Sequence, residues 1–263
     1  MKILVLIKQV PDTTDVKIDP VTNTLKREGV AAVINPFDMY AIEEALRVKE
    51  RVGGNSEVIV ISMGPPQAKE ALKEAISMGC DSAILLSDRK FAGSDTWATS
   101  YTLSQAIKKI GDYKVIFCGK QASDGDTAQV GPGVSMHLDV PQVTYVKKVE
   151  KIDTERATLE RMTEEGYDII ETPLPAVFTV VKEINEPRLP SLKGKMKAKK
   201  VEIPVWSADD IGCEEGKIGL EGSPTRVVKV FTPTPREGGQ LLTGEPEEIA
   251  VKLSCILKEV ILG

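Results

Sequence analysis

Short apolar runs alternate with amphipathic segments through the first half of the chain. The apolar runs lie at 3–7, 57–62, 82–86 and 114–118, and the amphipathic segments at 35–50, 67–78 and 94–109. Such runs are typical of strands buried on both faces, and an intervening helix joins two of them in parallel with a right-handed crossover. The pattern therefore predicts a doubly wound, mostly parallel α/β sheet of the Rossmann-like kind.

The second half of the chain lacks this alternation. Four strand patterns follow one another without helices, at 142–149, 156–162, 167–172 and 176–181, and we expect them to add antiparallel edge strands to the sheet. From Glu186 onward prolines recur without sustained periodicity, until an amphipathic pattern over 247–261 indicates a terminal helix. The sequence thus predicts a nucleotide-binding α/β domain at 1–185, and at 186–263 an extended arm whose helix packs on another subunit.

Charge and composition exclude several classes of function. The 34 basic and 39 acidic side chains leave a net charge of −5, without a basic stripe for nucleic acid. No apolar run approaches the roughly 20 residues that span a bilayer, and the N-terminal run ending at Lys8 is typical of a strand rather than a signal peptide. We therefore expect a cytoplasmic protein without membrane insertion.

Cysteine and histidine are too sparse for a metal site or a histidine-centred catalytic triad. The four cysteines lie far apart and are expected to be isolated buried thiols, and His137 is the one histidine. No catalytic side chain and no metal ligand are predicted. If the chain takes part in redox chemistry, an organic cofactor must supply it.

In an open α/β sheet, ligands bind beyond the carboxyl ends of the strands. Four segments are expected to converge there, namely 6–8, 35–38, 63–66 and 119–132. The last combines small residues with a helix expected to start at about Thr127, so backbone N–H groups and the helix dipole would face an anion. Thr127 and Gln129 would add side-chain donors, while Asp124 and Asp126 are better placed on ribose hydroxyls or loop N–H groups.

Each of these segments also has an ordinary structural interpretation. The run 124–127 is equally compatible with a turn and a helix cap, and its spacing matches neither G-x-G-x-x-G nor a Walker loop. Asn35 with Pro36 is a common helix start, and 94–100 fits a helix capped by Ser94 or Asp95 beside a core tryptophan. Five lysines in 193–200 fit a solvated surface or a contact with a subunit or nucleotide.

Taken together, these residues resemble the β subunit of electron transfer flavoproteins over essentially the whole chain. The resemblance rests on 35–38 with 41–45, on 63–65, on 75–81, on 119–122, and on 185–188 followed by 196–200. It implies an adenine nucleotide α-hydrolase-like fold and pairing with an α subunit that carries an FAD. In ordinary members the β subunit holds a structural AMP, and in electron-bifurcating members of anaerobes the same pocket holds a second FAD.

Two segments, 91–100 and 124–132, resemble the bifurcating type. That type implies an FAD that takes a hydride from NADH and sends one electron to ferredoxin or flavodoxin, and the other through the α-subunit FAD to a partner dehydrogenase. An acyl-CoA dehydrogenase or another flavin dehydrogenase would be that partner. The alternatives are a non-bifurcating β subunit holding structural AMP and a free-standing nucleotide-sensing domain.

The resemblance also implies which residues bind the cofactor. Thr96 and Thr99 would lie near the isoalloxazine ring, and Leu192 would lie in the loop that recognises the dehydrogenase, although Pro190, Lys193 and Gly194 depart from the family pattern. The adenine, ribose and phosphate positions would be lined by Leu6, Lys8, Asn35, Pro36, Phe37, Asp38, Met63, Gly64, Gly119, Lys120, Gln121, Ala122, Ser123, Asp124, Gly125, Asp126, Thr127, Ala128, Gln129 and Val130.

Overall fold

The computed structural model describes residues 1–12, 32–228, 238–239 and 241–262. Within them, nine strands form one sheet in the order β11-β5-β4-β1-β6-β10-β7-β8-β9, and β2 pairs with β3 in a separate antiparallel ribbon. The strands are β1 (Lys2–Leu6), β2 (Gln9–Pro11), β3 (Ala32–Ile34), β4 (Glu57–Met63), β5 (Ser82–Leu86), β6 (Tyr113–Gly119), β7 (Gln142–Ile152), β8 (Arg156–Met162), β9 (Tyr167–Pro173), β10 (Ala176–Val180) and β11 (Val205–Trp206).

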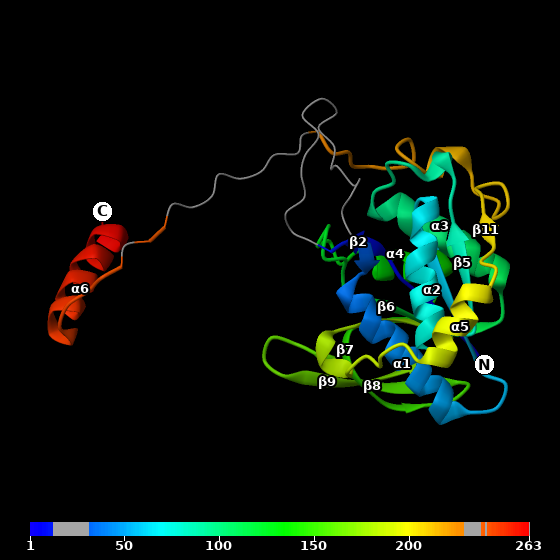
Figure 1. The fold of residues 1–263 in the computed structure, drawn as a ribbon, viewed down its shortest axis with the longest axis horizontal. Helices are drawn as coiled ribbons and strands as arrows, with labels where there is room; N and C mark the ends of the chain where they lie inside the picture. The colour runs from blue at the N-terminus through cyan, green and yellow to red at the C-terminus, as the bar shows by residue number, and fades with distance from the viewer. Residues whose placement is uncertain (13–31, 229–237, 240, 263) are drawn as a thin grey trace.

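Helices cover both faces of the sheet, as the alternating pattern predicts (Figure 1). The α-helices are α1 (Pro36–Val52), α2 (Lys69–Met78), α3 (Thr96–Ile110), α4 (Val130–Leu138), α5 (Leu192–Lys200) and α6 (Pro246–Leu262), and short 3-10 turns lie at Pro66–Ala68, Arg89–Phe91, Lys182–Ile184 and Glu215–Lys217. Alternate residues of β1 point to opposite faces: Ile3 and Val5 pack with α1 and α2, while Leu4 and Leu6 pack with α3 and α4. The doubly wound fold is therefore confirmed.

The order of the strands reverses beside β1. The chain runs from β1 through α1 to β4 and through α2 to β5 on one side, and then crosses through α3 to β6 on the other side. All of these strands are parallel, with Leu6 opposite both Ile61 of β4 and Cys118 of β6. Open α/β sheets hold ligands beyond the carboxyl ends of such strands, and we call this position, at the ends of β1 and β6, the crevice.

The predicted edge strands exist, but one of them lies elsewhere. β7, β8 and β9 pair antiparallel at one side of the sheet, as expected. The strand expected at 176–181 is instead internal and parallel, because β10 inserts between β6 and β7. All five residues of β10 are buried, which suits a strand covered on both faces rather than an edge strand.

Much of the segment after Glu186 packs on the same α/β unit. α5 lies beside α2 (Figure 1), and β11 extends the sheet next to β5. Further along, Asp95 accepts hydrogen bonds from the backbone N–H and the hydroxyl of Thr225, at 3.0 and 2.8 Å. The arm therefore crosses back to the start of α3. The division between residues 185 and 186 stays a prediction.

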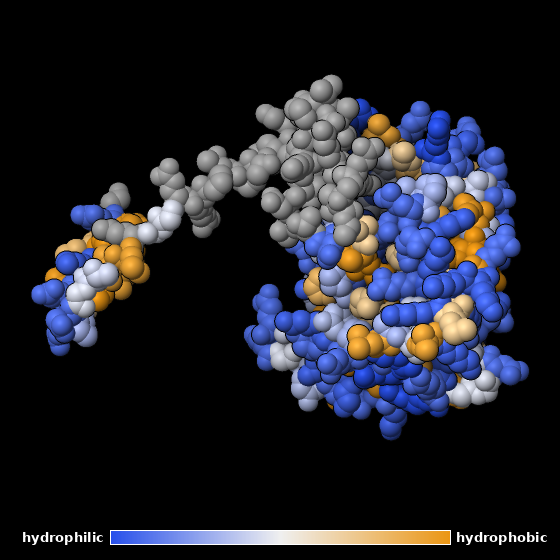
Figure 2. Space-filling view, in the orientation of Figure 1, coloured by the Kyte–Doolittle hydropathy of each residue, from blue (hydrophilic) through white to orange (hydrophobic). Residues whose placement is uncertain are grey.

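α6 stands apart from the sheet in Figure 1. Its apolar side chains are exposed and gather along the helix in Figure 2; they include Val251, Leu253, Leu257, Val260 and Ile261. Cys255 on α6 is also exposed, so the expectation of buried thiols is wrong at that position, whereas Cys80 and Cys118 are buried. In the part of the chain that the structure describes, no helix has the length and apolarity needed to cross a membrane.

Candidate functional site

The buried carboxylate of Asp38 joins the two strands that flank the crevice. Its Oδ2 accepts a hydrogen bond of 2.7 Å from the Lys8 N–H after β1, and its Oδ1 accepts one of 3.0 Å from the Gly119 N–H at the end of β6. Burial raises the pKa of Asp38 to about 7, although these donors, the Asn35 side chain and the Lys8 ammonium act to lower it. Asp38 thus holds the ends of β1 and β6 together, and burial of its carboxyl opposes ionisation of that group.

Asn35 holds the loop after β6 rather than capping α1. Its side chain makes no capping hydrogen bond, which corrects the expectation from the sequence. Instead Asn35 Nδ2 donates to the Gln121 carbonyl at 2.8 Å, and Asn35 Oδ1 accepts from the Ser123 N–H at 3.0 Å. Asn35 at the helix start and the expected phosphate loop, 86 to 88 residues apart in the sequence, are therefore one hydrogen-bonded unit.

Gly119, at the end of β6, lies directly against the first turn of α1. A Cβ at this position would lie 2.6 Å from Asp38 Oδ1 and 2.7 Å from the backbone carbon of Phe37. Real Cβ atoms do not come so near a backbone carbon. Glycine is therefore required for β6 to end against the first turn of α1.

The loop from Lys120 to Gln129 is held by its own acidic side chains. Lys8 Nζ donates to Asp124 Oδ1 at 2.6 Å, and Gln121 Nε2 donates to Asp126 Oδ1. Asp126 and Ala128 both have left-handed backbone, with φ of 52° and 55°. Each contact engages one oxygen of its carboxylate, and a role of Asp124 or Asp126 on ribose hydroxyls or loop N–H groups stays a prediction.

The helix after the loop begins at Val130, three residues later than predicted. Residues 127–129 belong to no helix or strand, and no described residue accepts a hydrogen bond from their backbone N–H groups. These N–H groups precede the positive end of the α4 dipole. They form a donor-rich stretch that faces no protein acceptor in the described part of the chain, which suits an anionic group.

The start of α3 lies against the start of α4. Asp95 caps α3, because its Oδ1 accepts from the N–H groups of Trp97 and Ala98, as one of the two predicted caps. Ser100 Oγ donates to the Thr96 carbonyl at 2.6 Å and also approaches the Val130 carbonyl at 3.2 Å. Thr96 and Thr99 are half-buried in this first turn. The hydroxyl-rich helix start thus borders the donor-rich stretch before α4.

The structure brings some of the expected site residues together and leaves others at a distance. Direct hydrogen bonds connect Lys8, Asn35, Asp38, Gly119, Gln121, Ser123, Asp124 and Asp126. Leu6 is buried in β1, and Pro36 begins α1. Met63 and Gly64 share the same sheet edge one strand away, where the Gly64 N–H donates to the Leu86 carbonyl. Ala122, Gly125, Thr127, Ala128, Gln129 and Val130 lie in or directly after the loop.

The sequence did not predict the contacts that this site makes with β7 and β10. Lys120 Nζ lies 5.1 Å from the ring centroid of Phe37 and 5.6 Å from that of Tyr145, within the range of a cation–π interaction. A Cβ on Gly131 would lie 2.6 Å from Thr179 Cγ2, so α4 begins directly against β10. The Gly131-Pro132-Gly133 run could have indicated this close packing of α4, because two glycines at a helix start allow a near approach of another element.

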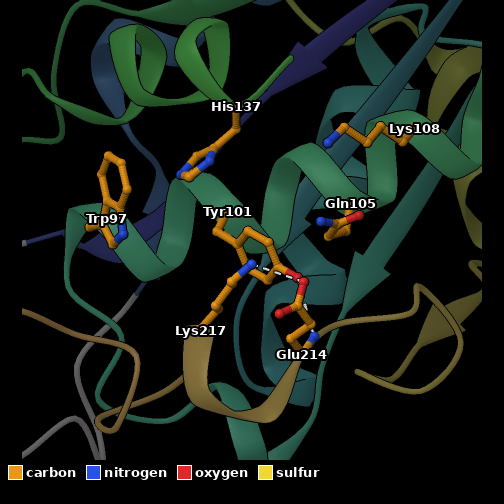
Figure 3. A pocket seen from close by; sticks show the side chains of 7 residues that line it. All are labelled: Trp97, Tyr101, Gln105, Lys108, His137, Glu214 and Lys217. Atoms are coloured by element: carbon orange, nitrogen blue, oxygen red, sulfur yellow. Dashed lines mark hydrogen bonds and ion pairs between the residues drawn. The ribbon is translucent and has the colours of Figure 1, made fainter. Parts of the chain in front are cut away.

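A hollow of about 390 Å³ opens on the face of the sheet covered by α3 and α4 (Figure 3). It is lined by Trp97, Tyr101, Gln105, Lys108, His137, Glu214 and Lys217. The Trp97 and His137 rings lie 4.6 Å apart, and Lys217 pairs with Glu214 at 2.9 Å. None of the residues expected to bind the cofactor lines this hollow, so it is separate from the crevice.

Leu192, the expected partner-binding residue, is the first residue of α5 and is 78% exposed. It lies beside α2, on the face of the sheet opposite to α3 and α4. The structure therefore separates it from the start of α3, where Thr96 and Thr99 lie.

Comparison with known proteins agrees with this geometry. Residues 22–211 match the electron transfer flavoprotein domain family. The chain is 54% identical over 254 residues to the electron transfer flavoprotein subunit beta of Thermoanaerobacterium thermosaccharolyticum, with 96% of each chain covered. It is 46% identical over 267 residues to the subunit of the same name from Megasphaera elsdenii, covering 99% of this chain and 98% of that one.

A third relative is a subunit of a named complex. The chain is 49% identical over 260 residues to the caffeyl-CoA reductase-Etf complex subunit CarD of Acetobacterium woodii, with 98% of each chain covered. A domain match over most of the chain and this degree of identity over nearly full length exceed what fold similarity alone produces. The chain therefore belongs to the electron transfer flavoprotein family, among its β subunits.

Proposed function

We propose that the crevice between β1 and β6 holds a complete FAD and that the chain is the β subunit of an electron-bifurcating electron transfer flavoprotein. When bound, this FAD would accept a hydride from NADH and release one electron to ferredoxin or flavodoxin and the other, through the α-subunit FAD, to a partner dehydrogenase. The protein's own part is to bind and orient the cofactor and to set its environment.

The residues at the crevice fit the pyrophosphate and ribose of an adenine nucleotide. The N–H groups of 127–129, for which no described residue is an acceptor, and the positive end of α4 suit the phosphates. The Lys8 ammonium at the same edge reduces the repulsion from Asp124. Asn35 and Asp38 keep the loop in this position through their hydrogen bonds to Ser123 and Gly119. An AMP moiety accounts for all of these features.

One observation favours a cofactor that extends beyond AMP. Thr96 and Thr99, on the first turn of α3, border the donor-rich stretch because Ser100 contacts the Val130 carbonyl. Polar hydroxyls on that side of the phosphates suit the ribityl chain and the polar edge of a flavin. The 49% identity to CarD, a subunit of a complex named for caffeyl-CoA reductase, adds support from a relative.

The exposed apolar side chains of α6 support a heterodimer. Val260 and Ile261 are 76% and 73% exposed, and no described element covers this helix in the isolated chain. Because an amphipathic helix gains most of its stability from packing its apolar stripe, α6 requires a partner. We assign that role to the α subunit and the exposed Leu192 to contact with an acyl-CoA dehydrogenase or another flavin dehydrogenase.

The α/β complex tests this function directly. Purified complex is mixed with NADH, ferredoxin and an acyl-CoA dehydrogenase with its enoyl-CoA substrate. A bifurcating subunit oxidises NADH at full rate only when both acceptors are present, and reduces about one ferredoxin equivalent per electron delivered to the dehydrogenase. Failure of NADH to reduce any flavin in the complex would contradict the proposal and favour a subunit holding structural AMP.

A further inference from the structure

Two exposed leucines lie at the start of α5: Leu189 precedes the helix, and Leu192 is its first residue. Leu189 is 88% exposed and Leu192 is 78% exposed, and we call residues 189–192 the docking turn. Among the described residues, none covers most of either side chain. In the proposed function this turn contacts the dehydrogenase, and the inference that follows rests on that assignment.

Arg188 fastens the near end of the docking turn to α1. Its Nε donates to Glu43 Oε2 at 2.7 Å, its NH1 donates to Glu50 Oε1 at 2.6 Å, and its NH2 bonds both carboxylates at 3.2 Å. The Arg188 N–H also donates to Glu43 Oε2 at 3.1 Å. One guanidinium therefore bridges two carboxylates that lie two turns apart on α1, a geometry that requires the planar fork of arginine.

The Arg188–Glu43 contact is largely shielded from solvent on the Glu43 side. The Glu43 side chain is 4% exposed, and Arg47 also donates to it, at 2.8 Å. Burial of Glu43 acts to raise its pKa, but the hydrogen bonds from Arg188 and Arg47 hold that pKa below its usual value. Asn185 adds a second attachment, because its Nδ2 donates to the Tyr40 carbonyl and to Glu44 Oε2.

The far end of the docking turn is fastened to α2. Ser191 caps α5 by accepting from the Gly194 N–H at 2.9 Å. A Cβ on Gly194 would lie 2.0 Å from the Ser77 carbonyl oxygen, so α5 contacts the last turn of α2 directly. Lys197 Nζ donates to the carbonyls of Cys80 and Asp81, at 2.9 and 3.0 Å.

The two helices that hold the docking turn, α1 and α2, both pack on the sheet. Ala41 and Ile42 of α1 and Leu72 of α2 are fully buried in one apolar cluster. The docking turn is therefore held at each end by a rigid element, and its leucines are preorganised for contact. A preorganised turn avoids the entropy that a free loop loses on binding, which raises affinity without adding a contact.

We propose that Arg188 is a positioning residue for partner docking, which holds the Leu189–Leu192 turn in its binding geometry by bridging Glu43 and Glu50 of α1. The residue acts through α1 and need not contact the dehydrogenase. Loss of the bridge frees the turn, while Asn35 and Asp38 at the start of α1 keep their hydrogen bonds, because these do not involve Arg188.

The first test measures the turn without any dehydrogenase. Hydrogen exchange of the backbone amides in 186–193 is compared in the α/β complex for the wild type, Arg188→Gln and Arg156→Gln. Arg156 is a matched control, because it also pairs with one glutamate, Glu171, at 2.8 Å on the distant β8–β9 pair. We expect exchange in the turn to rise about tenfold in Arg188→Gln alone. Unchanged exchange in that variant would overturn the proposal.

The second test measures docking with an acyl-CoA dehydrogenase that the wild-type complex reduces. Arg188→Gln should raise the KM for this dehydrogenase about tenfold while leaving kcat and the flavin content of the complex unchanged. Glu50→Gln should raise KM in the same direction, and the double variant should be no worse than Arg188→Gln, since both changes break one bridge. Additive effects, or a Glu50→Gln variant with wild-type KM, would show that Arg188 contacts the partner directly.

These two tests separate the inference from the function on which it rests. If no dehydrogenase is reduced by the wild-type complex, the proposed function fails, whereas the exchange result still decides whether Arg188 orders the turn. If reduction occurs and exchange is unchanged in Arg188→Gln, the function stands and the positioning role fails.

Discussion

Asp38 Oδ1 accepts a hydrogen bond of 3.0 Å from the Gly119 N–H, and this contact joins the first turn of α1 to the end of β6. The two residues are so close that a Cβ on Gly119 would lie 2.6 Å from the same oxygen. The expected phosphate loop therefore leaves the sheet from a position set by α1. The geometry of the loop depends on side chains from a distant part of the sequence.

Gly119→Ala should weaken cofactor binding and destabilise the fold. The added methyl meets the Phe37 backbone and Asp38, and overpacking of this kind costs about 1–3 kcal/mol. Gly166→Ala, in the turn between β8 and β9, is the matched control, because a Cβ there meets no atom within 4 Å. Cofactor retained after gel filtration and the thermal midpoint should fall in the first variant and stay near wild type in the second. Equal behaviour of the two variants would contradict the close approach.

Asp38→Asn should remove a pH dependence of stability between about pH 4 and 7. Burial raises the pKa of Asp38 from 3.8 to about 7, so the folded state holds the proton more tightly than the unfolded chain. The stability that this proton confers is complete below pH 3.8 and is lost as the pH rises through 7. A shift of this size corresponds to about 4 kcal/mol at most.

Denaturant unfolding from pH 4 to 8 measures this effect as the difference between wild type and Asp38→Asn. Asp153→Asn serves as control, since hydrogen bonds from the Glu155 and Arg156 N–H groups lower the pKa of that carboxyl. Its difference curve should stay flat over this range, because a pKa below the usual value confines the effect of Asp153 to lower pH. A flat difference curve for Asp38→Asn would mean that the carboxyl is not desolvated.

Asn35→Ala should loosen the phosphate loop more than it destabilises the chain. The change removes the hydrogen bonds to the Gln121 carbonyl and from the Ser123 N–H, with a loss of about 1–3 kcal/mol. Asn185→Ala also removes two hydrogen bonds of one side chain, but on the far side of α1. Only the first variant should lower FAD affinity, as measured by flavin fluorescence titration; equal affinities would assign Asn35 a purely structural role.

Lys8→Met should lower the affinity for an anionic cofactor in a salt-dependent way. The Lys8–Asp124 pair has side chains 49% and 22% exposed, so its own contribution to stability is below about 1 kcal/mol. Loss of the ammonium leaves Asp124 without this partner beside the position proposed for the phosphates. The affinity deficit should shrink between 50 mM and 500 mM salt, while Lys73→Met, which breaks the exposed pair with Glu70, leaves affinity unchanged. A deficit that does not change with salt would argue against an electrostatic role.

The sequence predicts the layered fold well because buried strands and amphipathic helices leave strong local patterns. The runs at 3–7 and 57–62 became β1 and β4, and the cap at Asp95 was one of two predicted. The placement of β10 could not be predicted in this way, because the apolar run 176–181 is compatible with an edge strand and with an internal strand. Its position between β6 and β7 is decided by long-range pairing, which no local pattern reports.

The candidate site was predictable as a set of segments but not as a set of contacts. Asn35 before Pro36 matches a helix cap, yet the structure uses its amide for the loop 86 residues further on. The start of α4 was predicted at Thr127, since Asp126 and Thr127 resemble caps. The left-handed backbone at Asp126 and Ala128 instead delays the helix to Val130 and leaves the intervening N–H groups without a protein acceptor among the described residues.

The nucleotide content of the purified α/β complex tests the central proposal most directly. The complex is denatured, flavin is quantified by its visible absorbance, and AMP is quantified by chromatography of the released nucleotides. A bifurcating β subunit predicts two FAD and no AMP per heterodimer, one FAD in each subunit. One FAD and one AMP per heterodimer would contradict the account and identify the nucleotide in the crevice of this chain as structural.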